Sequence, residues 1–491
     1  MDLEEDIIGV ISCPGPLKYC FDRFRLRTDD ATGWVYNNFG ANIGIVSNIF
    51  FSTAIIFFAR SQLDCAEPGD VCGRVHGLRP SSLVTVVVTF SGVITAFFMP
   101  YIGAIVDYTP KRKPLGILAC ILFIIIQSTQ ISISEQTWFA MAVLQAFNGF
   151  FYQINELCLT AYLPEIRDQV KEEKVFTWYN SLYTITGTIT QVLYLGVVIV
   201  FAGIYSWNDG QIGRFGQATA AVSGSFFWYI GWHFFRGKDA RRSLGAGKFL
   251  AVAGFEQITN TTKAIFKFYP RSIGTFFLGT VFVDGAVESL LSISITFYTV
   301  VLGFKATGVA ILLLLVLIFS TFGAFLMYFL TRRMDPMKLY KIIIVLMMIM
   351  NFASFMGLTR PSQKNMAYLI ASIFGIFVGF YYPLSRIIYA MIVPRGQEAE
   401  LSGFFRYCTQ VLAWLPPLTF TVINEKGYDF AFGAISVNGF MFIGLVIFMF
   451  MKPWNQCLED AKVNKMVREN IIEDKVDDEA GVSDESFHNN E

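Results

Sequence analysis

Stretches of about 20 apolar residues recur along this chain, with short polar interruptions between them. A helix needs about that length to cross a hydrocarbon core of roughly 30 Å, so we expect about twelve spans. They lie at residues 38–59, 82–106, 115–133, 137–163, 176–203, 215–235, 271–302, 306–330, 338–358, 365–393, 400–423 and 430–451. Because 54% of the residues are hydrophobic and 15% are charged, the polar side chains are too few to cover a soluble protein. We therefore predict an all-α integral membrane protein.

Short loops rich in Lys and Arg indicate the orientation of the chain. Lys111, Arg112 and Lys113 lie between the second and third predicted spans, and a second basic cluster lies within residues 332–341. Loops of this kind face the cytosol in multi-pass proteins, so we expect both termini there. The expected parts are a cytosolic N-terminal segment at 1–36, six-helix bundles at 37–236 and 271–452, a cytosolic basic linker at 237–270, and a disordered acidic cytosolic tail at 453–491.

Charge and metal-binding residues argue against several classes of function. The formal net charge is +0 and the basic residues form small clusters between spans, so no nucleic-acid partner is expected. The three His and the scattered Cys suggest no metal site, no cofactor and no catalytic set of a membrane enzyme. Cys65 and Cys72 lie in the first non-cytosolic loop, where a disulfide and two free thiols both fit the sequence.

An internal repeat relates the two halves of the chain. A shift of 230 residues aligns Gly149–Glu165 with Gly379–Arg395, in the fourth and tenth predicted spans. The alignment places Gly149 on Gly379, Phe150 on Phe380, Tyr152 on Tyr382, Pro164 on Pro394, and Glu156 opposite Arg386. Two parallel six-helix repeats are the architecture of the major facilitator superfamily, so we predict that fold.

The segment "GAIVDYTPKRKP" resembles the signature that joins spans two and three in that superfamily. Its matching residues are Gly103, Asp107, Lys111, Arg112 and Lys113. We expect Gly103 to permit close helix approach, and Asp107 to accept hydrogen bonds from the N-terminus of a neighbouring helix. The resemblance implies that this cluster latches a cytosolic gate. A loop that only sets the topology is the alternative.

Four further segments resemble the autophagy-related vacuole effluxer family within the superfamily. They are "GWVYNNFGAN", "NELCLTAYLPEI", "FVDGAVES" and "GFYYPLSRIIYAMIVPRGQEAELSGFF". The resemblance implies a secondary active transporter that moves amino acids from a vacuole- or lysosome-like compartment to the cytosol by alternating access. Two alternatives stay open. One is a transporter of another small solute at a different membrane, such as the plasma membrane, and the other is a non-transporting receptor or scaffold.

Ionisable residues inside predicted spans indicate a polar cavity. A charge at the bilayer centre costs about 3 kcal/mol, so Glu156 should face protein or water. Helices one, four, seven and ten line the central cavity in the superfamily, and ionisable or amide side chains occur on all four. We predict a substrate cavity with Glu156, Arg386, Asp284, Glu288, Tyr152, Tyr382, Asn42 and Asn48.

Glu156 and Arg386 have two interpretations that can both hold. They can form a buried bridge that ties the halves together, or Arg386 can bind a substrate carboxylate bidentately while Glu156 or Asp284 meets its ammonium group. Asp284 and Glu288 lie one helical turn apart, and this like-charged pair is the expected site of proton coupling. We expect the chain to act as a monomer, and the turn at Pro394–Glu400 to contact the loop between spans two and three.

Overall fold

Helices make up nearly all of the computed structural model, which describes residues 25–63, 73–170, 173–240, 244, 249–267, 269–393 and 398–460. The helices of the first half are α2 (Asp29–Ser61), α3 (Leu83–Tyr108), α4 (Arg112–Gln130), α5 (Trp138–Val170), α6 (Glu173–Tyr205) and α7 (Asp209–Phe234). After α8 (Leu250–Lys267) come α9 (Arg271–Val300), α10 (Ala306–Leu330), α11 (Pro336–Gly357), α12 (Lys364–Ile392), α13 (Glu398–Val411), α14 (Leu415–Glu425) and α15 (Phe430–Met449). Short 3₁₀ turns at Pro80–Ser82 and Pro361–Gln363 complete the described elements.

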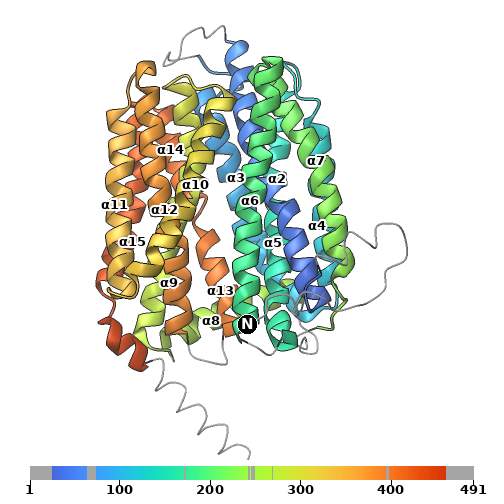
Figure 1. Ribbon diagram of the computed structural model, residues 1–491, viewed down its shortest axis with the longest axis vertical. Helices are drawn as coiled ribbons and strands as arrows, with labels where there is room; N and C mark the ends of the chain where they lie inside the picture. The colour runs from blue at the N-terminus through green and yellow to red at the C-terminus, as the bar shows by residue number, and fades with distance from the viewer. Residues whose placement is uncertain are drawn as a thin grey trace, which may run out of the picture.

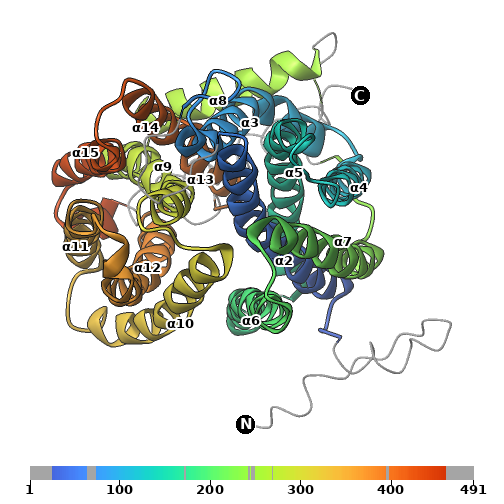
Figure 2. The same cartoon turned by 90° about the horizontal axis from the view of Figure 1, so that it is seen from above.

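The helices form two bundles that stand side by side, α2–α7 and α9–α15 (Figures 1 and 2). Nine of the described helices, counted with the turn that precedes two of them, are long and apolar enough to cross a membrane. The bundles also use α5, α7 and the pair α13–α14, which are more polar or interrupted. The predicted major facilitator fold, with about twelve spans in two six-helix bundles, is confirmed.

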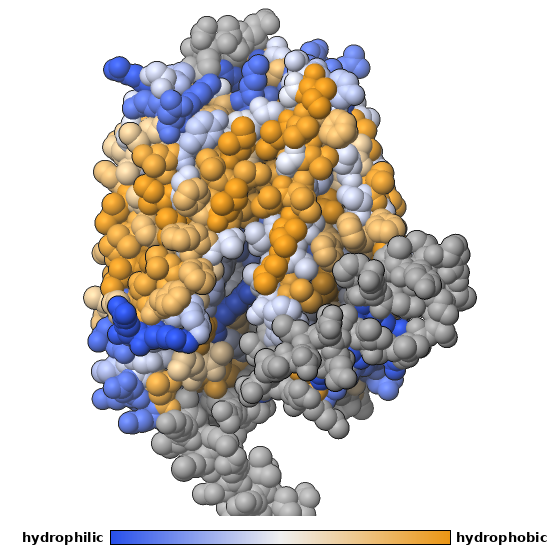
Figure 3. All heavy atoms as spheres, in the orientation of Figure 1, coloured by the Kyte–Doolittle hydropathy of each residue, from blue (hydrophilic) through white to orange (hydrophobic). Residues whose placement is uncertain are grey.

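The outer surface of the molecule fits a bilayer. A broad belt of hydrophobic side chains surrounds the middle of the face seen in Figure 3, and hydrophilic side chains gather at the two ends. Large apolar residues such as Phe97, Leu193 and Phe325 are each 63% exposed within this protein. A soluble protein rarely exposes so continuous an apolar surface. The chain is therefore a multi-pass membrane protein.

The aligned glycines of the repeat, Gly149 and Gly379, both lie where two helices approach each other closely. A Cβ atom on Gly149 of α5 would lie 2.4 Å from Ser91 Oγ of α3. A Cβ atom on Gly379 of α12 would lie 2.0 Å from the Ser320 carbonyl oxygen of α10. The contact at Gly379 is with backbone, so only glycine leaves room there, whereas at Gly149 the Ser91 hydroxyl could rotate away from a larger side chain.

The first and eleventh spans differ from their predicted bounds. Helix α2 begins at Asp29, nine residues before the predicted start at 38, because the Thr28 side chain caps it and two acidic residues occupy its first turn. The predicted span at 400–423 is broken between α13 and α14. Pro416 and Pro417 supply no N–H groups there, so the helical hydrogen bonds cannot continue.

The predicted linker at 237–270 contains helix α8, which lies across one end of the molecule. Figure 2 shows α8 lengthwise, whereas the spanning helices are seen nearly end on. It packs tightly on α3, since a Cβ atom on Gly254 would lie 2.1 Å from the Pro100 carbonyl oxygen. We call this end, with α8 and Lys111, the linker face, and the opposite end, with Arg74 and Glu425, the loop face. Residues 454–460 of the predicted tail are helical, and its remainder lies outside the described residues.

Candidate functional site

Charged and polar contacts close the loop face between the two halves. Glu425 at the end of α14 accepts a hydrogen bond from the Arg79 backbone N–H at 2.8 Å. Its other oxygen lies 3.3 Å from the Arg74 guanidinium. On a second seam, Asp209 at the start of α7 accepts a hydrogen bond from the Ala306 N–H of α10 at 3.0 Å. Both seams join residues from opposite bundles.

Hydrogen bonds between side chains extend this seal into the protein. Asn424 Nδ2 lies 2.7 Å from both the Ser81 and the Ser82 hydroxyl oxygens. One turn deeper, the buried hydroxyls of Thr85 and Thr421 lie 2.8 Å apart. Three residues of α14 are therefore bonded to residues 79–85, at and just before the start of α3, and the halves are held together at this end. We call these contacts, with those of Glu425, the loop-face seal.

A cavity of about 620 Å³ lies between the halves toward the linker face. Helices α3, α5, α8 and α13 supply its walls, and Figure 3 shows a hollow with hydrophilic side chains in the corresponding half of the molecule. Arg406 and Gln410 of α13 and Gln153 of α5 contribute polar groups to the lining. Gln153 Nε2 donates to Gln410 Oε1 at 3.3 Å and so crosses between the halves. The cavity can hold a small polar solute.

None of the eight predicted cavity residues lines this cavity directly, whereas Gly103 and Asp107 of the predicted gate do. The two predicted carboxylates of α9 are held by the tenth span. Asp284 is 7% exposed and accepts a hydrogen bond from the Tyr381 hydroxyl. Glu288 is exposed and lies 3.5 Å from the Tyr382 hydroxyl. Since Glu288 occupies the middle of a span, its exposed side chain faces water between the halves.

Glu156 is half-buried on α5, and its counter-charge differs from the one expected. Of the described cations, Arg406 is the one that attracts the Glu156 carboxylate. Arg386 makes no ion pair with Glu156 in the described part of the chain, and it lies instead within electrostatic range of Tyr183, Tyr382 and Arg406. The structure therefore gathers Glu156, Glu288, Arg386 and Arg406 at one place without the predicted Glu156–Arg386 bridge.

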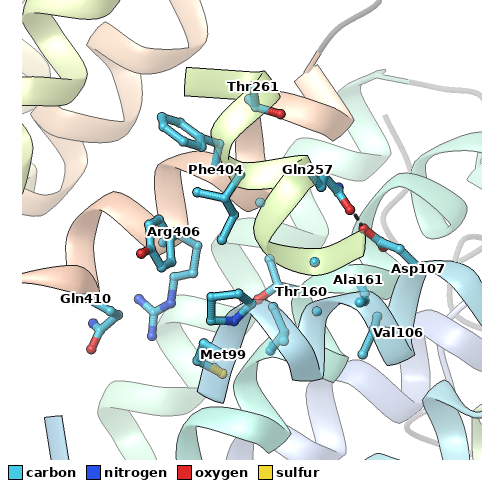
Figure 4. Close-up of a pocket in the computed structure, with 18 of the residues that line it drawn as sticks. Met99, Val106, Asp107, Thr160, Ala161, Gln257, Thr261, Phe404, Arg406 and Gln410 are labelled. Carbon is cyan, nitrogen blue, oxygen red and sulfur yellow. Dashed lines mark hydrogen bonds between the residues drawn. The ribbon is translucent and has the colours of Figure 1, made fainter. Parts of the chain in front are cut away.

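Arg406 is a residue that the sequence reasoning missed. It lies in the middle of the predicted span at 400–423, so the rule that drew attention to Glu156 applies to it equally. Figure 4 shows its side chain beside Gln410 and Met99 in the cavity. Electrostatic attraction acts on it from Glu156 and Glu288.

The remaining predicted cavity residues have mainly structural contacts. Asn42 donates to Asn38 and accepts a hydrogen bond from Gln191 Nε2 at 2.6 Å, which ties α2 to α6. The Tyr152 ring is tilted against Phe123, with 6.4 Å between centroids. Asn48 Oδ1 is buried with no hydrogen-bond partner among the described residues.

The predicted gate residues divide into two groups. Asp107 accepts a hydrogen bond from Gln257 Nε2 of α8 at 3.2 Å, so its partner is a side chain and not a helix N-terminus (Figure 4). Gly103 faces the cavity, and a Cβ atom there would meet nothing within 4 Å. The prediction that Gly103 permits close helix approach is therefore wrong.

The basic gate residues bond inside the first half. Arg112 is 1% exposed, lies 2.5 Å from Glu165 Oε1, and stacks over the Tyr162 ring at 5.1 Å. Lys113 donates to the Phe235 carbonyl oxygen, and Lys111 is exposed. These contacts join α4, α5 and the end of α7, so they stabilise one bundle and do not cross to the other.

Some predicted features fall outside the described residues. Cys65 and Cys72 are among them, as are residues 394–397 of the predicted turn. Cys120, Cys158, Cys408 and Cys457 are buried free thiols. Of the residues that the structure describes, no three His, Cys, Asp or Glu side chains are grouped to hold a metal ion.

Two six-helix bundles around a polar cavity, sealed at one end, are the architecture of the major facilitator fold. The fold is similar to that of the xylose transporter XylE from E. coli in an inward-open conformation, with a TM-score of 0.59, 13% identity, and coverage of 88% of this chain and 98% of that one. It is also similar to a mutant form of the nucleoside transporter NupG, with a TM-score of 0.58, 14% identity, and coverage of 86% and 100%. The family model described as vacuole effluxer Atg22 like matches residues 31–177 and 181–461, so the chain belongs to that family.

Two curated relatives agree with this family. Autophagy-related protein 22 of Vanderwaltozyma polyspora is 23% identical over 185 residues, which cover 36% of this chain and 36% of the relative. Autophagy-related protein 22 of Kluyveromyces lactis is 19% identical over 186 residues, which cover 36% and 38%. The chain thus matches little more than a third of the length of each relative. The chain is therefore a member of the family described as vacuole effluxer Atg22 like, and its fold is that of the major facilitator transporters it is compared with.

Proposed function

We propose that this protein is a secondary active transporter of small polar solutes, above all amino acids, that releases them from a vacuole- or lysosome-like lumen into the cytosol. The single observation that carries the proposal is the asymmetry between the ends, because the loop face is sealed while a polar cavity lies toward the linker face. The Lys- and Arg-rich loops favour a cytosolic linker face, with both chain termini on that side. The family description supports the vacuolar membrane.

The charges beside the cavity support a zwitterionic substrate. Glu156, Asp284 and Glu288 supply carboxyl groups, and Arg386 and Arg406 supply guanidinium groups, within one region between the halves. An amino acid presents one carboxylate and one ammonium group, so it can satisfy both signs. A sugar presents neither. The chain would work as a monomer, because each alternating-access unit needs one pair of bundles.

Proton coupling is the second part of the proposal. Asp284 and Glu288 lie one turn apart on α9, and Tyr381 and Tyr382 of α12 hold them by hydrogen bonds. Two neighbouring carboxyl groups ionise together at a cost, so such a pair readily carries one proton between them. In an acidic compartment, the proton would bind from the lumen and leave to the cytosol together with the solute.

Reconstituted vesicles test the proposal. The purified chain is placed in liposomes, and the movement of radiolabelled amino acids, a sugar and a nucleoside is followed with and without a proton gradient. We expect saturable transport of amino acids that increases with a gradient directed from the loop face to the linker face. Saturable binding without transport would support a receptor or scaffold, and transport of the sugar or the nucleoside alone would replace the amino-acid assignment.

A further inference from the structure

Arg406 is a cation without a bonded partner among the described residues. Its backbone carbonyl accepts a hydrogen bond from the Thr409 hydroxyl, but its guanidinium makes no hydrogen bond or ion pair with any described residue. The side chain is partly buried and lines the cavity between the halves. A guanidinium removed from bulk water is costly unless an anion or several acceptors face it.

A second guanidinium, that of Arg386, lies nearby; it is exposed and lies outside the cavity lining. Arg386 makes no hydrogen bond or ion pair within the described ranges, and it repels Arg406 electrostatically. Two like charges close to each other are stabilised when an anion lies between or beside them. Glu156 and Glu288 attract Arg406 over a distance, yet neither makes an ion pair with it in the described chain. The protein therefore leaves the donors of both arginines available.

Gln410 adds a neutral donor next to Arg406. It follows Arg406 by one helical turn on α13, so both side chains point to the same side of the helix. Its Oε1 accepts the hydrogen bond from Gln153, and this contact directs its Nε2 group away from that acceptor. In the described part of the chain, Gln410 Nε2 donates to no residue. Figure 4 shows the Gln410 and Arg406 side chains on the same side of the cavity.

We infer that Arg406 and Gln410 form an anion subsite that binds the carboxylate of the transported solute, with Arg386 as a second cation at its edge. This inference rests on the proposed transport of amino acids. A guanidinium donates two parallel hydrogen bonds to a carboxylate, and Lys at this place offers only a point charge. The sequence suggested that Arg386 binds the substrate carboxylate. We assign this role mainly to Arg406, because Arg406 lines the cavity and Arg386 does not. The ammonium group of the solute then faces Glu156 and Glu288.

A comparison of an amino acid with its amide tests the subsite. The pair differs in the carboxylate, so wild-type protein should bind the acid about 10- to 100-fold more tightly, as expected for a charge-assisted hydrogen bond. Arg406→Gln should bind acid and amide equally well, and Arg406→Lys should keep part of the preference. Arg333→Gln, in an exposed loop on the linker face, is the matched control and should behave as wild type. If Arg406→Gln keeps the full preference for the acid, the subsite is refuted.

Chemical protection separates the subsite from the transport proposal. Phenylglyoxal modifies accessible arginines, and mass spectrometry reads the modification of Arg406 in full-length protein in nanodiscs. We expect protection by an amino acid and none by its amide. Protection by inorganic phosphate or a dicarboxylate, without any by amino acids, would keep the anion subsite and overturn the amino-acid substrate. Labelling of Arg406 that none of these anions reduces would overturn the subsite itself.

Discussion

The loop face and the linker face of this protein are held by different kinds of contact. At the loop face, Glu425, Asn424 and Thr421 bond to residues of the other bundle. At the linker face, Arg112 pairs with Glu165 and Lys238 with Asp30, and all four residues belong to the first half or its immediate end. One set of bonds must break when the halves rock, whereas the other can stay intact.

This difference shows which residues set conformation and which set stability. Alternating access moves two bundles against each other around a central site. Contacts between bundles therefore change the balance between the two open states, since they exist in one state and not the other. Contacts within a bundle are present in both states, so their loss lowers the stability of each state by a similar amount. Substitutions at four positions test this division.

The largest effect is expected from Arg112→Ala. Losing one partner of a fully buried ion pair typically costs about 3 to 5 kcal/mol. The cost here should be lower, because Glu165 is 21% exposed and lies 3.8 Å from Lys238, but Arg112 is itself buried and also stacks on Tyr162. We expect a clear fall in the melting temperature of the purified protein, with the remaining folded fraction transporting normally. Lys111→Ala, one residue away and exposed, is the control and should leave the melting temperature unchanged. A stable Arg112→Ala protein with an altered open state would mean that this pair acts between the halves.

The loop-face seal should respond in the opposite way to Glu425→Ala. This change removes the acceptor of the Arg79 N–H and the partner of Arg74, and charged hydrogen bonds contribute about 1.5 to 3 kcal/mol. The population open at the loop face should rise about 10- to 100-fold with little change in thermal stability. A cysteine at Ala96, which lines the cavity and takes no part in the seal, reports this opening through its reaction with an impermeant maleimide added at the loop face, with Cys65 and Cys72 replaced by Ser.

Glu135→Ala serves as the control for the seal. Glu135 lies at the same end of the molecule and is exposed, so its replacement should leave the maleimide reaction of Ala96→Cys unchanged. If Glu425→Ala reacts at the same rate as this control, the contacts of Glu425 do not close the loop face.

Asp107→Asn should have a smaller effect, because asparagine can still accept the hydrogen bond from Gln257 without the charge. The loss of charge assistance is worth about 1 kcal/mol, which predicts a fall in turnover of about three- to tenfold. Substrate affinity should stay within a few-fold, since Asp107 lies at the cavity wall beside α8. Turnover equal to wild type would reduce this motif to a signal of membrane topology.

The smallest effect is expected from Gly103→Ala, which sharpens the comparison at the linker face. A Cβ atom at Gly103 meets open space, so stability and transport should change by less than about 0.5 kcal/mol. Gly254→Ala is the matched contrast, because its Cβ atom would collide with the Pro100 carbonyl oxygen and displace α8. A strong defect in Gly103→Ala alone would show that the halves close on Gly103 in another state.

The spans could be predicted from the sequence because the length of an apolar run is a one-dimensional property. Span 306–330 agrees with α10 at both ends. Two consecutive prolines inside an apolar run indicate the break near Trp414. It was not predicted, because the high hydropathy of that run favoured one continuous span. Helix α8 was missed because its basic residues dominated the interpretation of the linker.

The partner of Glu156 could not be predicted in the same way. The repeat places Glu156 opposite Arg386 in the alignment, but equivalent positions in two repeats are related by a symmetry axis and touch only where they lie on it. Contact depends on how each helix is rotated and how deep the residue lies. Arg406 belongs to the eleventh span, which the repeat aligns with the fifth span and not with the fourth. The repeat therefore gave no reason to pair Arg406 with Glu156.

The break between α13 and α14 separates the part of the eleventh span that lines the cavity from the part that forms the loop-face seal. The Trp414 indole N–H donates to the Val411 carbonyl oxygen at 2.9 Å, so the interruption satisfies one of the carbonyl groups that it frees. Arg406 lies on one side of this joint, and Glu425 and Asn424 lie on the other. A continuous helix would tilt as one rigid body, so a tilt of its cavity end would move its seal end directly. Because the helix is broken, a displacement of Arg406 reaches the seal through neighbouring helices such as α9, whose Gly285 packs against Leu412.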